Sequence, residues 1–335
     1  MSVKGVILSC KGIKLSKAEK FFFSKINPFG FILFKRNFKN SLQIINLIKE
    51  IKEITLNKKL LVFVDQEGGR VQRFDNEEFL KIPSQYFLGE AYDKNKTFAK
   101  KLAYYNAYKT GLQIKNLGVD VNFSPVLDLK FAYGNNIIGD RSFGNNPEKV
   151  SILGKQYCKG FRDSGIIPVL KHFPGHGRSK LDSHFDLPKL QVSKKDLLQK
   201  DVKAFISLKQ EIFVMLAHIV YEKLDYNVAT YSKKIINEIL IKKMKFKGLI
   251  ITDDLSMKAL KGNMIERTVK SYNAGCDIVL YCDAKLDDMK KIYEYSREIK
   301  KEKIIFLNKY KKKLGNLKML DSENLNKILY SNAKY

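Results

Sequence analysis

Eight short apolar runs recur along this chain of 335 residues. Each run is continuously apolar rather than alternating, as strands are when helices cover both faces of a parallel sheet. We therefore predict eight strands buried on both sides, at Gly5 to Cys10, Phe29 to Phe34, Leu60 to Asp65, Val119 to Leu129, Ile166 to Lys171, Phe213 to Ala217, Gly248 to Asp253 and Asp277 to Cys282.

Longer segments with apolar residues at three- and four-residue spacings separate these runs, as in amphipathic helices. They are Ser41 to Glu53, Asn95 to Leu117, Pro147 to Asp163, Lys194 to Leu208, Lys233 to Met244 and Ile265 to Ala274. Eight strands alternating with helices predict an α/β fold, a single (β/α)8 barrel of the TIM type. Since no linker divides the chain, we expect one domain over residues 1–335. Lys285 to Tyr335 should supply the final helix and a short C-terminal helical extension packed on the outside of the barrel.

Localisation is indicated by two absences in the sequence. The N-terminus has no basic segment or cleavage site, and no apolar run approaches the roughly 18 to 20 residues of a membrane span. The four cysteines form neither a CxxC pair nor a disulfide framework, so we interpret them as reduced thiols in or near the core. We therefore expect a cytoplasmic protein that does not insert into membranes.

A net charge of +27 suggests a partner with a phosphate backbone or another polyanion. The distribution of charge argues against this, because only eight of the 62 basic residues are arginines and the lysines are scattered along nearly every amphipathic segment. Aromatic residues are not interleaved with arginine as in an RNA-binding surface. We therefore expect no nucleic-acid partner, and a polyanion-binding protein on an inactive barrel remains the alternative from another class.

The segment after the fifth run holds His172, His176 and His184, three of the four histidines in the chain. Because barrel enzymes keep their chemistry in the loops at the C-terminal ends of the strands, we predict that this loop is catalytic. The spacing of His172 and His176 is also found in zinc sites, but Pro174 and Gly175 between them disfavour the required helix. We expect no metal and no cofactor.

A paired acid and base fits this loop better. Asp182 and His184 are close enough for the carboxylate to hold one imidazole nitrogen while the other faces a substrate. Asp253 ends a buried strand at the same mouth, where a carboxylate could attack the anomeric carbon of a sugar. Alternation along the strand directs only one of Asp253 and Asp254 towards the barrel axis, and the other could cap the following helix.

Arginine is concentrated at the predicted strand ends, whereas lysine covers the rest of the chain. Arg36, Arg70, Arg73, Arg141 and Arg178 all fall in these loops. Planar, bidentate recognition of a ligand explains this preference, although an ordinary ion pair that holds a loop is the alternative for each one.

In this order, the strand-end motifs resemble those of the glycoside hydrolase family 3 β-N-acetylhexosaminidases of the bacterial cell-wall-recycling type. The most specific combination is Lys171-His172-Phe173-Pro174-Gly175-His176-Gly177 with Asp182-Ser183-His184. Further matching segments are Gly30 to Asn37, Asp65 to Arg73, Asn122 to Asp128, Gly139 to Phe143, Gly248 to Met257 and Ala274 to Asp277. The loop Arg178-Ser179-Lys180-Leu181 departs from the acidic or small residues common in the family.

The resemblance implies a retaining glycosidase, with Asp253 as nucleophile and His184, oriented by Asp182, as general acid and base. It also implies that Asp65, Arg73, Arg141, Lys171 and His172 hold the hydroxyls and N-acetyl group of a terminal GlcNAc. The expected substrate is a small carbohydrate, β-linked GlcNAc on anhydro-N-acetylmuramic acid, with or without a peptide, and we expect a monomer. The alternatives within the family are a β-glucosidase and a phosphorylase, in which phosphate replaces water.

Overall fold

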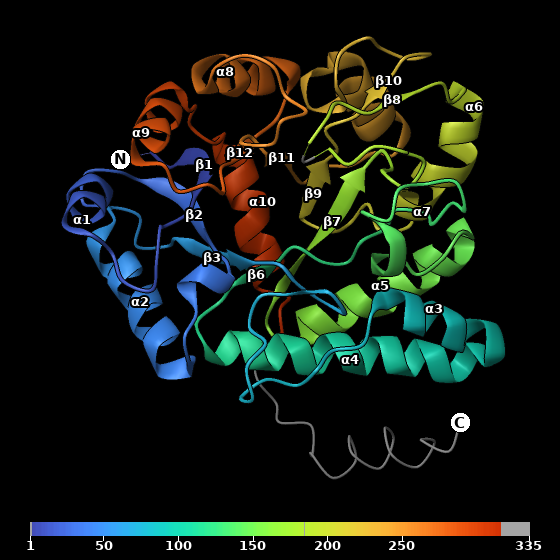
Figure 1. Cartoon of the computed structure of the whole chain (residues 1–335), viewed down its shortest axis with the longest axis horizontal. Helices are drawn as coiled ribbons and strands as arrows, with labels where there is room; N and C mark the ends of the chain where they lie inside the picture. The colour runs from blue at the N-terminus through green and yellow to red at the C-terminus, as the bar shows by residue number, and fades with distance from the viewer. Residues whose placement is uncertain (1, 184, 316–335) are drawn as a thin grey trace.

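The structure is a computed structural model that describes residues 2–183 and 185–315, and it confirms the predicted barrel. Eight parallel strands close in the order β1-β12-β11-β9-β7-β6-β3-β2, surrounded by helices (Figure 1). Each predicted apolar run supplies one strand. The strands are β1 (Lys4–Leu8), β2 (Pro28–Leu33), β3 (Leu61–Val64), β6 (Val121–Asn122), β7 (Ile167–Phe173), β9 (Phe213–Leu216), β11 (Leu249–Asp254) and β12 (Ile278–Leu280).

Each predicted amphipathic segment is helical. The helices are α1 (Lys17–Phe23), α2 (Ser41–Ile54), α3 (Gln85–Lys94), α4 (Lys96–Asn116), α5 (Pro147–Asp163), α6 (Lys194–Asp196), α7 (Val202–Ile206), α8 (Met264–Ala274), α9 (Leu286–Tyr295) and α10 (Lys301–Lys311). Of these, α1 and α3 are additional helices that the sequence pattern did not predict. Two π-helical segments, Leu197–Asp201 and Ile235–Lys243, occupy the middle of two predicted helices. Asparagine side chains cap α2, α4, α5 and α8 by accepting hydrogen bonds from first-turn amides.

The fourth strand is shorter than the sequence predicted. Regular pairing is limited to Val121–Asn122, and beyond it only Val126 makes a bridge, to Lys171. Pro125 has no amide hydrogen to donate, which interrupts regular pairing, although main-chain hydrogen bonds to β7 continue from Ser124 to Leu127. The rest of the predicted run, up to Leu129, is buried, so packing also contributes to its apolar character.

Aromatic residues fill the barrel interior. The rings of Phe63 and Phe123 are 5.4 Å apart, and those of Phe29 and Phe213 are 5.9 Å apart, measured between centroids. A second, larger apolar cluster lies between the barrel and its helices. The two clusters explain why the strands read as continuously apolar, because both faces of each strand are buried.

The C-terminal part of the described chain supplies two helices after the last strand. The first, α9, packs against β1 and α8. Leu307 and Tyr310 of α10 belong instead to the barrel-interior cluster. The amine of Lys303 donates to the carbonyl of Gly248, just before β11, so α10 covers the N-terminal end of the barrel. Residues 316–335 of the expected extension lie outside the described residues.

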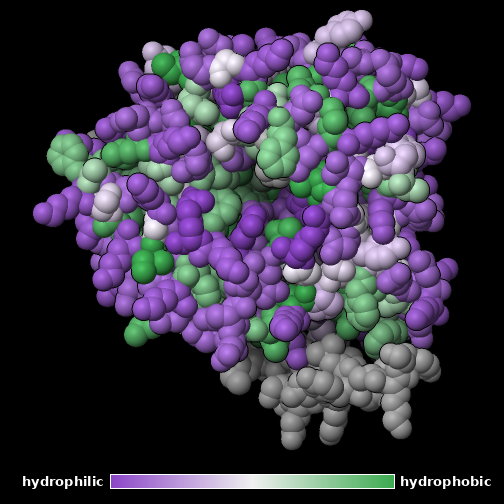
Figure 2. Space-filling model, viewed as in Figure 1, coloured by the Kyte–Doolittle hydropathy of each residue, from purple (hydrophilic) through white to green (hydrophobic). Residues whose placement is uncertain are grey.

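The four thiols behave as predicted. Cys10, Cys158 and Cys276 are buried, Cys282 is half-buried, and all four are free cysteines. Within residues 2–183 and 185–315, no helix is both long and apolar enough to cross a bilayer. Hydrophilic side chains are spread over most of the face shown in Figure 2 rather than gathered at one edge, as expected for scattered lysines.

Candidate active site

A cavity of about 290 Å³ lies at the C-terminal ends of the strands. Its walls combine apolar side chains with charged groups that converge from separate strand ends, the usual composition of a small-molecule site. The apolar residues include Ile32, Phe123, Met215, Met257 and Leu280, and the polar ones are Asp65, Glu67, Arg70, Arg73, Arg141, Lys171, His172, His176, Ser183, Asp253 and Asp254.

The structure brings together most of the predicted site residues. Asp65, Arg73, Arg141, Lys171 and His172 line this cavity, and so does Asp253. Asp182 is half-buried and does not line the cavity itself, but the next residue, Ser183, does. His184 lies outside the described residues.

The loops that carry these groups depend on glycine at two places. Gly68 and Gly69 have φ of +100° and +55°, so they form the turn of the hairpin β4 (Gln66–Gly68) and β5 (Val71–Gln72) that follows Asp65. In the histidine loop, a Cβ on Gly177 would lie 1.6 Å from the carbonyl oxygen of Leu129. The loop can therefore lie on the neighbouring backbone only because a glycine stands there.

A network of buried ion pairs forms one wall of the cavity. The Lys171 amine lies 2.9 Å from Asp65 Oδ1 and 2.5 Å from Glu67 Oε1. Arg141 donates to both Glu67 oxygens, at 2.8 and 2.9 Å, and Arg73 donates to Asp65 at 3.2 Å. The network holds three cations in fixed orientations around the space where a ligand would lie.

Both carboxylates in this network remain ionised. Burial alone would raise the pKa of Asp65, but Lys171 and Arg73 outweigh it and hold that pKa below its usual range. Burial likewise opposes ionisation of Glu67, yet Arg141 and Lys171 lower its pKa to about 2. The wall therefore presents fixed dipoles and charges to polar substituents at neutral pH.

Asp128 fixes His172, near the end of β7, and His176, in the loop that follows. Its fully buried carboxylate lies 2.6 Å from His172 Nδ1 and accepts from the His176 amide, also at 2.6 Å. The Nδ1 atom of His172 thus has its partner, which leaves Nε2 of a cavity-lining ring for a ligand. Burial and the neighbouring His172 lower the pKa of His176 to about 4, so this second ring is neutral under ordinary conditions.

The end of β11 presents Asp253 to the cavity. The main-chain amide of Asp254 donates to Asp253 Oδ1 at 2.8 Å. The structure contradicts the prediction that Asp254 caps the following helix, because Asn263 is the N-cap of α8. Its carboxylate instead accepts from the amides of Ser256 and Cys282, both at 3.0 Å, which ties β11 to β12.

The arginines divide into two groups. Arg70, Arg73 and Arg141 line the cavity, in agreement with a role in ligand recognition. Arg178 instead forms an ion pair with buried Asp201, with 2.8 Å between Nε and Oδ2, and Arg36 donates to Ser9 and to main-chain carbonyls. Arg178 is therefore the ordinary loop-holding ion pair that the sequence left open.

Sequence reasoning did not single out Glu67, Asp128, His176 or Ser183 as site residues. Glu67 follows one predicted strand and Asp128 lies near the end of another, which was the available signal, but their partners are 74 and 44 residues away in the chain. His176 and Ser183 lay inside the recognised motif. Their contact across the loop depends on the folded backbone, so the sequence alone could not assign it.

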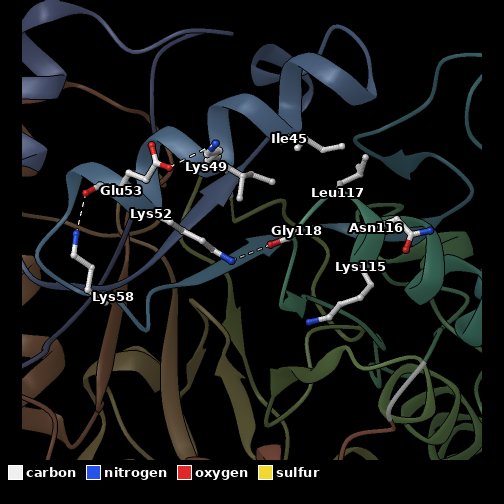
Figure 3. Close-up of a pocket in the computed structure, with 10 residues that line it drawn as sticks. Ile45, Lys49, Lys52, Glu53, Lys58, Lys115, Asn116, Leu117 and Gly118 are labelled. Atoms are coloured by element: carbon white, nitrogen blue, oxygen red, sulfur yellow. Dashed lines mark hydrogen bonds and ion pairs between the residues drawn. The ribbon is translucent and has the colours of Figure 1, made fainter. Parts of the chain in front are cut away.

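A second, more open depression lies between α2 and α4 (Figure 3). It is larger, at about 590 Å³, and the residues that line it are mainly lysines and aliphatic side chains, with Glu53 the one carboxylate among them. In Figure 3 the amine of Lys52 donates to the Gly118 carbonyl, at 3.2 Å, rather than pointing towards a catalytic partner. We place the candidate active site at the barrel mouth, where carboxylates, imidazoles and cationic side chains converge.

A (β/α)8 barrel with carboxylates at its mouth, beside cationic groups and apolar walls suited to a sugar, is the arrangement that many glycoside hydrolases use. Residues 2–305 match the glycosyl hydrolase family 3 N-terminal domain. The chain is similar to β-hexosaminidases of Haemophilus influenzae, at 36% identity over 288 residues (84% of this chain and 80% of that protein), and of Nitrosospira multiformis, at 36% over 290 residues (84% and 81%). It is also similar to the structure of NagZ from Neisseria gonorrhoeae in complex with N-trifluoroacetyl-D-glucosamine, with a TM-score of 0.86, 32% identity, and coverage of 99% of this chain and 95% of that one.

The chain belongs to glycosyl hydrolase family 3. Within that family it is a β-N-acetylhexosaminidase.

Proposed function

We propose that this enzyme removes terminal β-linked GlcNAc from peptidoglycan fragments, GlcNAc on anhydro-N-acetylmuramic acid with or without a peptide, during cell-wall recycling. The supporting observation is that Asp253 and the five candidate sugar-binding residues line one cavity although they come from four strand ends. The N-trifluoroacetyl-D-glucosamine held by the Neisseria gonorrhoeae protein supports a GlcNAc-like ligand.

Hydrolysis proceeds in two steps in this proposal. The Asp253 carboxylate attacks the anomeric carbon while His184 donates a proton to the departing oxygen, which forms a covalent glycosyl-enzyme. His184 then removes a proton from water, which attacks the same carbon, releases GlcNAc and regenerates the Asp253 carboxylate. Asp182 orients the imidazole and stabilises its protonated form.

The remaining cavity residues bind the sugar. Asp65 can accept from hydroxyls, while Arg73, Arg141 and Lys171 donate to hydroxyl and carbonyl oxygens. Their ion pairs hold them in place before the substrate arrives, so little side-chain ordering remains for binding. His172, fixed through Nδ1 by Asp128, contributes its other ring nitrogen.

We also propose that the enzyme acts as a monomer in the cytoplasm. One chain supplies every cavity residue named above, and its four free cysteines suit a reducing compartment. A molecular mass by light scattering close to 38.7 kDa is expected, and a stable mass twice as large would contradict the monomer.

Azide rescue of two variants tests the assigned roles separately. With a dinitrophenyl β-GlcNAc glycoside, Asp253→Ala should lose activity by on the order of 10³-fold or more. Azide should restore turnover and give the α-configured glycosyl azide, because it enters from the vacated nucleophile side. His184→Ala should instead give the β-azide, because azide then attacks the glycosyl-enzyme.

Full activity of either variant without azide would remove its assignment. The wild-type reaction should yield GlcNAc with or without inorganic phosphate. Formation of GlcNAc-1-phosphate at the expense of free GlcNAc would identify a phosphorylase instead.

A further inference from the structure

Ser183 stands at the point where the loop after β7 turns into the protein. Its side chain lines the cavity and the residue is only 1% exposed, whereas Leu181 and Phe185 are 44% and 71% exposed. Ser183 also lies directly between Asp182 and residue 184 in the sequence. Any contact that fixes Ser183 therefore acts one residue away from both members of the proposed acid and base pair.

Two contacts fix Ser183, one through its side chain and one through its main chain. The hydroxyl oxygen is 2.9 Å from His176 Nε2, near the start of the same loop. The carbonyl oxygen accepts from the amide of Ala259 at 3.3 Å, in the loop that follows Asp253. Ser183 thus connects the loop after β7 with the loop after β11.

His176 is a rigid anchor for this contact. The residue is 3% exposed, and its amide donates to buried Asp128 at 2.6 Å. The preceding carbonyl, of Gly175, accepts from the buried Tyr221 hydroxyl at 2.8 Å. The His176 ring lies edge-on to His172, with 5.7 Å between centroids. Backbone and ring are therefore both held before they meet Ser183.

We infer that Ser183 is a positioning residue that holds the loop carrying Asp182 in place relative to the segment after Asp253, and so affects proton transfer by the proposed acid and base. The inference rests on the proposed function. The hydroxyl contact with His176 fixes the loop from one side, and the carbonyl contact with Ala259 fixes it to the segment after the nucleophile. Because a displacement of about 1 Å can cost about 100-fold in rate, loss of one contact should be measurable.

The test compares leaving groups, because only a poor leaving group needs its proton at the right place. Ser183→Ala should lower kcat/KM roughly 10- to 100-fold for a methylphenyl β-GlcNAc glycoside. For the dinitrophenyl glycoside, kcat/KM should change little. Ser179→Ala is the matched control, because within residues 2–183 and 185–315 the hydroxyl of that buried serine bonds with Leu181 of its own loop alone. Its effect should be small for both substrates.

A double-mutant cycle tests the contact itself. If Ser183 acts through His176, the variant with both Ser183→Ala and His176→Asn should lose no more than the more damaging single change. Equal losses on both substrates for Ser183→Ala, or additive losses in the cycle, would overturn the inference. If Ser183→Ala leaves activity unchanged while Asp253→Ala and His184→Ala abolish it, the inference about Ser183 is wrong and the proposed function stands. If Asp253→Ala retains full activity, the proposed function is wrong and the inference falls with it.

Discussion

Replacing Glu67 should measurably destabilise the fold, although the residue lies at a ligand site rather than in the apolar core. The side chain is 1% exposed and faces both Arg141 and Lys171. Burial opposes its ionisation, but these cations lower its pKa from 4.5 to about 2, which corresponds to about 3 kcal/mol of stability at neutral pH. Removing one partner of a buried ion pair typically costs about 3 to 5 kcal/mol, which agrees in size.

We expect Glu67→Gln to lower the free energy of unfolding by about 3 kcal/mol at pH 7, measured by urea denaturation with an unchanged slope. The depressed pKa makes this contribution complete above pH 4.5 and removes it as the pH falls towards 2, so the difference between variant and wild type should shrink in acid. Glu50→Gln is the control, because Glu50 pairs with Lys20 at the surface, with 36% and 46% of the side chains exposed. The control should cost less than about 1 kcal/mol. A Glu67→Gln loss no larger than that of the control would refute the reasoning.

Two further predictions concern His176 and α10. Burial and His172 lower the pKa of His176 in the folded protein to about 4. Below pH 6.5 this histidine is therefore protonated more readily in the unfolded chain than in the folded one. The free energy of unfolding should consequently drop by up to about 3 kcal/mol between pH 6.5 and 4. His176→Asn should flatten this part of the stability curve, and an unchanged slope in calorimetry would contradict the prediction. Leu307→Ala should lose about 3 kcal/mol of stability without changing kcat, because Leu307 is 5% exposed and closes the barrel at the end away from the cavity. Ile305→Ala, at a residue 55% exposed, should be nearly neutral, and equal effects of the two changes in urea titrations would argue against the packing of α10.

The barrel could be predicted because a strand that is buried on both faces needs a continuous run of apolar residues, which is easily recognised in the sequence. Continuous apolar runs such as that of β2 are required wherever a strand contacts both the interior and the helices. The same reasoning placed the site, since the polar residues that follow such runs meet at one end of a parallel barrel. Asp65 and Asp253 were found in this way.

The element boundaries that were predicted wrongly, or not at all, depend on contacts between residues that are distant in the sequence. Nothing in the run after Val121 shows that regular pairing ends at Asn122, because the later residues remain apolar, partly for packing reasons. The helix α3 was not predicted, and Gly89 within it lies against the backbone of Phe143, where a Cβ would be 1.8 Å from the carbonyl oxygen. That glycine looks like a helix breaker in sequence, whereas in the fold it permits close packing.

The roles of individual polar residues were the least predictable part. Arg178 and Arg141 both follow strand ends, yet one pairs with buried Asp201 away from the cavity and the other lines the cavity beside Glu67. Which carboxylate each arginine meets is decided by the packing of loops. Sequence position restricts a residue to the barrel mouth but does not select its partner.

Covalent trapping tests the central claim most directly. A β-GlcNAc fluoride with a second fluorine at C5 should form the glycosyl-enzyme readily, because fluoride leaves easily, and release it slowly, because the ring fluorine destabilises the charge that develops during hydrolysis. Peptide mass spectrometry of the trapped enzyme should locate the sugar on Asp253. A label on another residue, or an oxazoline product with no protein-bound sugar, would contradict the assignment of Asp253 as the nucleophile.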